Sequence, residues 1–339
     1  MTLYNPPMDN ETQPENEINN KEVFPIEVLI SKYFNAHSKF ITIENMNIHY
    51  RDEGSGPILV LLHGVCSSLH TWDAWVKHLK PYYRVIRIDI PGFGFSGPFK
   101  KEIYDPDKGV QLIHQIISAL NIENFYLAGN SIGGFFSWRY TLKYPEKVDK
   151  LILIDPVGYN QALPWVVKFA SHPAIRPLAK FIMPRFFFHM AANQVYGDKS
   201  KLTKDIKARY FDLAMYKDNK KAYVNFFTVM RNLCDSPDLP KGITEIKTPT
   251  MVMWGTKDEW VPLKYCKQWK NDLQNGTFVI YEGAGHTPNE EIPEKTAQDA
   301  CLFLEGKFLS DKIIPDFIEN KIRSNFKIHT KTPLAVATA

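Results

Sequence analysis

The sequence has little of what marks several large protein classes. It contains four cysteines in 339 residues, and no two of them have the C-x-x-C spacing typical of zinc or redox sites. We therefore expect free thiols in a reducing compartment, without a metal site, a cofactor or a disulfide framework. The net charge of +4 is too mild to predict a nucleic-acid partner.

Long apolar runs are also missing. No stretch approaches the roughly 18 apolar residues that cross a bilayer. Residues 1–24 are rich in Asn, Glu and Pro, and they carry neither the basic nor the apolar region of a secretory signal. These observations predict a disordered lead over residues 1–24 and a cytoplasmic protein. The oligomeric state stays open.

What the sequence does contain is an alternation of strand and helix patterns. Two alternating runs followed by continuous apolar runs predict eight strands, at 39–43, 47–50, 58–62, 85–90, 125–129, 151–154, 250–254 and 278–280. Helical spacing is found near 26–36, 70–80, 107–121, 132–144, 262–273 and 293–308. This order predicts an α/β fold with a doubly wound, mostly parallel, eight-stranded sheet.

One stretch breaks the alternation. Residues 157–242 show no strand pattern and are too long for a loop, so we expect an inserted helical cap. The sheet core would then come in two parts, 25–156 and 243–308, followed by an extension at 309–339 in which 313–326 has helical spacing. The cap is rich in aromatic residues and basic, with fourteen Lys and Arg against six Asp and Glu.

The most specific motif is Gly-Asn-Ser-Ile-Gly-Gly at residues 129–134. It follows a strand pattern and opens a helical one, which is the context of a G-x-S-x-G nucleophile elbow. A sharp strand-to-helix turn strains the backbone of Ser131 and requires small neighbours, which Gly129 and Gly133 supply. The helix N-terminus there would stabilise negative charge. We predict that Ser131 is a nucleophile.

A serine nucleophile needs a base, and the base needs a group that orients it. In open α/β sheets such groups come from loops at the carboxyl ends of the strands. His286 follows the strand pattern 278–280 in a glycine-rich loop and is the predicted base. Asp258 follows 250–254 and is the predicted acid, because the order Ser, Asp, His is common in this fold. Asp155, which ends an earlier strand, remains a rival.

Acyl transfer also needs donors for the developing oxyanion. The backbone N–H of Ile132, directly after the nucleophile, is one expected donor. The loop after the strand 58–62 supplies the other, the N–H of Val65. Cys66 and Asn130 are expected to contact the substrate, and His63 is expected to have a structural role.

Together these motifs resemble the α/β-hydrolases with a helical cap, over roughly residues 39–308. The resemblance is carried by His63-Gly64, Asp89 with the following Pro-Gly-Phe-Gly, the elbow, Asp258, and Gly285-His286. The chain is similar both to bacterial carboxylesterases and lipase-like enzymes and to the C–C bond hydrolases that cleave ring-fission products. Dehalogenases and epoxide hydrolases of this fold have aspartate at the elbow, so Ser131 argues against both.

The resemblance implies cofactor-independent hydrolysis of a carboxylic ester, with a small apolar ester as substrate. C–C bond hydrolysis, lactone hydrolysis, acyl transfer and a non-enzymatic ligand receptor stay open as alternatives. The expected lining of the acyl pocket is aromatic and comes from the cap: Trp165, Phe169, Phe181, Phe186, Phe187, Phe188, Tyr210, Phe211, Phe226 and Phe227. Basic residues beside these aromatics also predict weak peripheral contact with a membrane.

Overall fold

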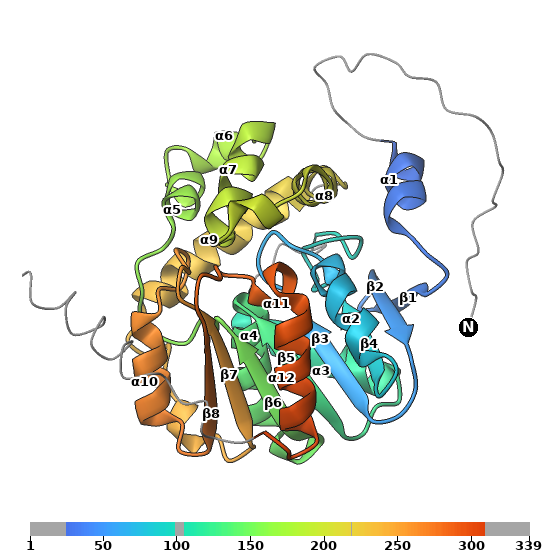
Figure 1. The fold of residues 1–339 in the computed structure, drawn as a ribbon. Helices are drawn as coiled ribbons and strands as arrows, with labels where there is room; N and C mark the ends of the chain where they lie inside the picture. Colours follow the sequence, from blue (N-terminus) through green and yellow to red (C-terminus); the bar gives the residue numbers. More distant parts are fainter. Residues whose placement is uncertain (1–24, 99–104, 218, 309–339) are drawn as a thin grey trace, which may run out of the picture.

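One eight-stranded sheet runs through the computed structural model, which describes residues 25–98, 105–217 and 219–308 (Figure 1). Along the sheet the strand order is β1-β2-β4-β3-β5-β6-β7-β8. The strands are β1 (Ser38–Ile43), β2 (Met46–Glu53), β3 (Ile58–Leu62), β4 (Arg84–Ile88), β5 (Phe125–Asn130), β6 (Val148–Ile154), β7 (Thr250–Gly255) and β8 (Gly276–Tyr281).

The pairing of these strands confirms the predicted sheet. β1 and β2 form an antiparallel hairpin, and β2 lies antiparallel to β4. The other five pairings, from β4 and β3 across to β7 and β8, are parallel. The carboxyl ends of six parallel strands therefore meet at one edge, where the predicted reactive loops leave the sheet.

Helices cover both faces of the sheet and its carboxyl edge. They are α1 (Ile26–Tyr33), α2 (Asp73–Leu79), α3 (Pro106–Ala119), α4 (Ile132–Lys143), α5 (Trp165–Ser171), α6 (Arg176–Ala179), α7 (Arg185–Val195), α8 (Lys204–Ala214), α9 (Asn219–Asp235), α10 (Lys264–Asp272), α11 (Pro288–Glu291) and α12 (Pro293–Leu304). Of these described helices, none combines the length and the apolarity that a bilayer crossing requires.

Alternation along the strands divides the core into two clusters. In β3, Leu59 and Leu61 pack with residues of α2 and α12, whereas Val60 and Leu62 pack with residues of α3 and α4. Both sets are fully buried. This explains why the strand reads as a continuous apolar run, since each face of the sheet is covered by helices.

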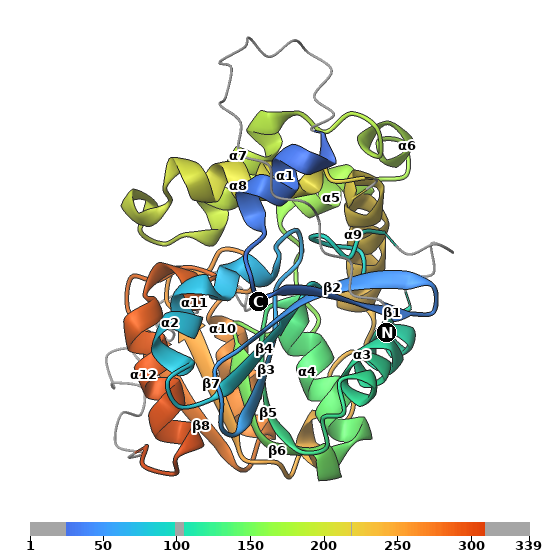
Figure 2. The ribbon, with the colours of Figure 1, turned by 90° about the vertical axis from the view of Figure 1, so that its right-hand side faces the viewer.

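Five helices, α5 to α9, are inserted between β6 and β7 and lie over the carboxyl edge of the sheet (Figures 1 and 2). No strand occurs among the described residues of this insertion. The cap packs on the core through aromatic contacts, as where Phe93 meets Tyr223 and Phe226 of α9 at centroid distances of 5.2 and 5.0 Å. The predicted cap boundaries at 157 and 242 stay predictions, and the proposed lead and C-terminal extension lie outside the described residues.

Candidate active site

Ser131 occupies a strained turn between β5 and α4. Its backbone angles are φ 57° and ψ −117°, in a region that costs a non-glycine residue about 1–3 kcal/mol. The surroundings hold it there, because its N–H donates to the Ile154 carbonyl at 2.9 Å. A Cβ on Gly133 would lie 2.3 Å from the Leu62 carbonyl oxygen, so only glycine fits at that position. This is the turn that the elbow motif predicts.

His286 and Asp258 form a buried pair at the same edge of the sheet. The Nδ1 of His286 lies 2.8 Å from Oδ2 of Asp258. The other carboxylate oxygen accepts the N–H groups of Trp260 at 2.7 Å and Val261 at 2.9 Å. Because the carboxylate is fixed and can only accept, the proton of the neutral ring is held on Nδ1. The Nε2 of His286 is buried and bonds to no group that the structure describes, so it is available to a proton from another group.

Asp155 lies beside this pair, at the end of β6. Its Oδ1 accepts the N–H of Gly255 at 3.0 Å, and the side chain is fully buried. Burial, together with the nearby Asp258 carboxylate, raises the pKa of Asp155 well above its ordinary 3.8. A raised pKa disfavours the anion that would stabilise an imidazolium. Since Nδ1 of His286 is paired with Asp258, the geometry also favours Asp258 over Asp155 as the acid.

One ligand atom each from Asp155, Asp258 and His286 lies within 4.8 Å of the others, a spacing that a metal ion can bridge. In Asp258, however, both oxygens already accept hydrogen bonds, one of them from His286. A metal ion would have to displace these bonds. The cluster fits a proton-transfer pair better than a metal site.

Ser131 and His286 line one pocket beneath the cap. Its described lining comes from the β3 loop, the elbow, α7, α8 and the loops after β7 and β8: Gly64, Val65, Cys66, Ser67, Asn130, Ser131, Phe188, Ala191, Ala192, Val195, Tyr210, Trp260, His286 and Thr287. The structure thus brings the predicted Val65, Cys66 and Asn130 to the same pocket as the predicted nucleophile and base.

Two of these residues have roles that the contacts define. Asn130 donates its Nδ2 to the backbone carbonyls of His286 at 2.9 Å and Ile154 at 3.2 Å, so its amide joins the histidine loop to the elbow. Burial raises the pKa of the Cys66 thiol well above its usual range. A thiol that stays protonated is a poor nucleophile. We therefore assign Cys66 to the lining of the pocket and not to the catalytic groups.

The loop after β3 runs directly against the elbow. A Cβ on Gly64 would lie 2.9 Å from Oδ1 of Asn130 and 3.3 Å from the Cβ of Ser131. This close approach brings Val65 to the pocket beside Ser131. Ile132 is the first residue of α4, where N–H groups are free of helical partners. The two backbone donors predicted for an oxyanion thus come from segments in contact with the nucleophile.

The cap aromatics require a correction. Phe188 and Tyr210 line the pocket, but Trp165, Phe186 and Phe187 do not. Trp165 and Phe186 are 47% and 66% exposed, and Phe187 is buried between Trp165 and Phe188. Helical geometry is the reason, since α7 turns one stripe at i, i+3, i+4 and i+7 to the pocket: Phe188, Ala191, Ala192 and Val195.

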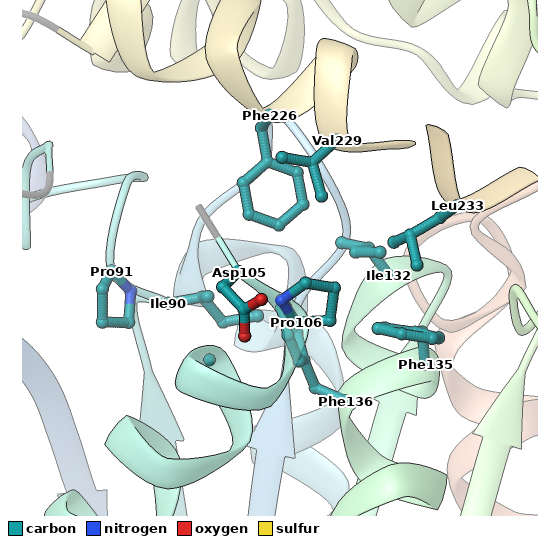
Figure 3. Close-up of a pocket in the computed structure, with 11 residues that line it drawn as sticks. Ile90, Pro91, Asp105, Pro106, Ile132, Phe135, Phe136, Phe226, Val229 and Leu233 are labelled. Atoms are coloured by element: carbon teal, nitrogen blue, oxygen red, sulfur yellow. The ribbon is translucent and has the colours of Figure 1, made fainter. Parts of the chain in front are cut away.

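A second, apolar pocket lies between α9 and the start of α3 and α4 (Figure 3). Phe226 and Val229 of α9 face Ile132 and Phe136 of α4 across it (Figure 3). The only titratable group among its described lining residues is Asp105, which caps α3 by accepting the N–H of Lys108 at 2.9 Å. Its described lining residues include no Ser, Thr, Cys, His or Lys, so we assign this pocket to the packing of the cap on the core.

Sequence reasoning missed two residues of the site. Trp260 stacks on His286, with ring centroids 5.8 Å apart, and its position two residues after Asp258 was the available signal. Glu291 is buried and accepts the N–H groups of Gly285 at 2.8 Å, Gly197 at 3.0 Å and Asp198 at 2.7 Å. It ties the histidine loop to the end of α7, and nothing in the sequence distinguished it from a surface glutamate.

Residues 57–293 match the family model described as "alpha/beta hydrolase fold". Since this match covers most of the chain, the protein belongs to the α/β-hydrolase family.

Three proteins illustrate the similarity. A 2-hydroxy-6-oxononadienedioate/2-hydroxy-6-oxononatrienedioate hydrolase of Paraburkholderia phymatum is 28% identical, over 79% of this chain and 96% of its own. A 2-hydroxy-6-oxo-6-phenylhexa-2,4-dienoate hydrolase of Burkholderia cepacia is 26% identical, over 74% of this chain and 90% of its own. The solved structure of a bacterial membrane phospholipase A is 27% identical, with a TM-score of 0.68 over 80% of this chain and 86% of its own.

Proposed function

We propose that this hydrolase cleaves an uncharged carboxylic ester through an acyl-enzyme on Ser131. The observation that carries the proposal is the buried Asp258–His286 pair, which opens with Ser131 into one largely apolar pocket. None of the described residues that line this pocket is Arg or Lys. A pocket without a cation suits a neutral acyl chain better than a charged one.

The mechanism follows from the positions of the side chains. Ser131 attacks the ester carbonyl and passes its proton to Nε2 of His286, while Asp258 holds the ring and stabilises the imidazolium. The N–H groups of Val65 and Ile132 receive the oxyanion. His286 returns the proton to the leaving alkoxide, and it then activates the water that releases the acid. No step requires a metal or a cofactor.

C–C bond hydrolysis is the second candidate, and the curated relatives favour it. Their names specify dienoate and dienedioate substrates, which fits this alternative better than ester hydrolysis. The phospholipase is about equally similar in sequence, and its name fits hydrolysis of an ester. A dienoate carries at least one carboxylate that a cation would have to receive. Arg209 lies beside the pocket residue Tyr210, but its guanidinium is paired with Glu290. The site therefore supports ester cleavage better.

Substrate profiles separate the two candidates. We expect measurable turnover on p-nitrophenyl esters from acetyl to dodecanoyl, and a kcat/KM at least about tenfold lower on a 2-hydroxy-6-oxo-dienoate, because the substrate carboxylate would be buried without a counter-charge. The reverse ranking, with the dienoate preferred, would assign the protein to C–C bond hydrolysis and reject the ester proposal.

The pH profile tests the role of His286. Only the neutral imidazole accepts the Ser131 proton, so kcat/KM on an aryl ester should rise as the pH is raised from acidic towards neutral. EDTA should leave the rate unchanged. Loss of activity on chelation, restored by a divalent ion, would contradict the mechanism.

A further inference from the structure

The outer face of the cap exposes much apolar surface. Six large side chains that we call the cap patch are about half exposed or more: Trp165 (47%), Phe169 (51%), Leu178 (59%), Ile182 (63%), Phe181 (64%) and Phe186 (66%). They come from α5, from α6, from the residues directly after α6 and from the start of α7. These elements belong to the cap, which lies over the carboxyl edge of the sheet (Figures 1 and 2). Such a concentration within one short segment marks an interaction surface.

The same segment is apolar on its inner side as well. Residues between those of the patch are buried against the rest of the cap: Val166, Val167, Ala170, Ala179, Met183 and Phe187. A helical segment with large apolar side chains on two opposite sides is most stable when both sides are covered. The described part of the chain leaves the side chains of the cap patch about half exposed or more, so the cap patch is free to bind a partner.

Charge indicates which partner fits. The sequence has no Asp or Glu between Asp155 and Asp198, whereas Lys168, Arg176, Lys180 and Arg185 all lie in this stretch. Lys168 and Arg185 are exposed. Aromatic and aliphatic side chains among basic residues suit the boundary between lipid headgroups and acyl chains, where the cations meet lipid phosphates. A second copy of the chain would bring like charges together.

We propose that the cap patch docks peripherally on an anionic phospholipid bilayer. The apolar side chains insert at the headgroup boundary, and each basic residue close to the surface increases partitioning about fivefold at low salt. Salt weakens this electrostatic part and leaves the apolar part intact.

Docking would place lipid next to the candidate active site. Along α7, Phe186 belongs to the patch, Phe187 is buried, and Phe188 lines the pocket that holds Ser131. One helix thus has both the membrane-facing surface and the pocket wall. The inference that a membrane ester reaches Ser131 from this side rests on the proposed function, but docking itself does not.

Vesicle co-sedimentation of the full chain tests the proposal. Phosphatidylcholine vesicles with and without phosphatidylserine are compared at low and high salt. The matched variants are Leu178→Ser/Phe181→Ser/Ile182→Ser in the patch and Phe40→Ser/Tyr82→Ser, which removes aromatics that are 43% and 62% exposed on the sheet core. Thermal melting confirms folding, and turnover of a water-soluble aryl ester is measured separately, so failure of docking and failure of the ester proposal give different results.

We expect the wild type to sediment with phosphatidylserine vesicles at low salt. The patch variant should lose about tenfold or more of this binding, and the Phe40/Tyr82 variant should keep it. Negligible binding of the wild type to both vesicles would overturn the proposal. So would equal binding by the wild type and the folded patch variant, or a wild-type dimer that the patch variant converts to monomers, since a second copy would then cover the patch.

Discussion

Ser131→Ala should abolish ester hydrolysis while leaving the fold intact. The hydroxyl is the attacking group in our mechanism, and removing the nucleophile of a serine triad lowers kcat on the order of 10⁴- to 10⁶-fold. Alanine adopts the strained turn as serine does, and the main-chain bond to the Ile154 carbonyl remains. Initial rates on a p-nitrophenyl ester, with thermal melting as a folding control, provide the measurement.

Ser137→Ala is the matched control for this experiment. Ser137 is a buried serine on α4 whose hydroxyl donates to the Gly133 carbonyl at 2.7 Å, and it does not line the pocket. We expect it to keep activity within a few-fold of wild type. If Ser131→Ala retained more than about a tenth of the wild-type rate, the nucleophile would have to be another residue.

Asp258→Asn should cost far more activity than Asp155→Asn. An amide in place of Asp258 can present a donor to Nδ1 of His286, which favours the wrong tautomer and leaves the imidazolium without its anion, with a loss on the order of 10⁴-fold in kcat. The raised pKa of Asp155 favours its uncharged form, which asparagine resembles, and asparagine reproduces the acceptor for the Gly255 N–H. We expect Asp155→Asn to stay within about tenfold of wild type. The reverse ranking would assign the role of the acid to Asp155, at the end of β6.

The shifted pKa of Asp155 adds a stability prediction. Its pKa is raised in the folded protein, so above about pH 4 the unfolded chain releases a proton that the folded chain retains. The contribution of Asp155 to the free energy of unfolding therefore falls as pH rises. Asparagine does not titrate, so its contribution does not change with pH. The Tm of Asp155→Asn relative to that of wild type should therefore increase as the pH rises above about 4. A Tm difference independent of pH would show that Asp155 titrates normally.

The sheet and the elbow could be predicted because their determinants are local. The run 58–62 is apolar throughout since both faces of the strand are covered, and Gly129 to Gly134 specify a turn within six residues. Asp258 and His286 are predicted from their places after the last two strands of the chain. Parallel pairing brings the carboxyl ends of these two strands, β7 and β8, together.

The cap could not be predicted to the same detail. Which face of α7 meets the pocket depends on how α7 packs on α8 and on the core, so the sequence could not distinguish Phe186 from Phe188. Glu291 bonds three backbone N–H groups, two of them from Gly197 and Asp198, more than ninety residues away in the chain. Such contacts have no local signature. The substrate class is equally hidden, because one fold hosts many reactions.

Covalent trapping of the nucleophile tests the central claim most directly. A p-nitrophenyl alkylphosphonate is attacked at phosphorus by an activated serine, releasing p-nitrophenolate and leaving a stable phosphonyl ester in the geometry of the acyl-transfer intermediate. Mass spectrometry of the intact protein and of its peptides should find one adduct per chain, on Ser131, and His286→Ala should form it at least about a hundredfold more slowly. Stoichiometric labelling of any other residue, or no labelling of a chain that still hydrolyses esters, would contradict the account.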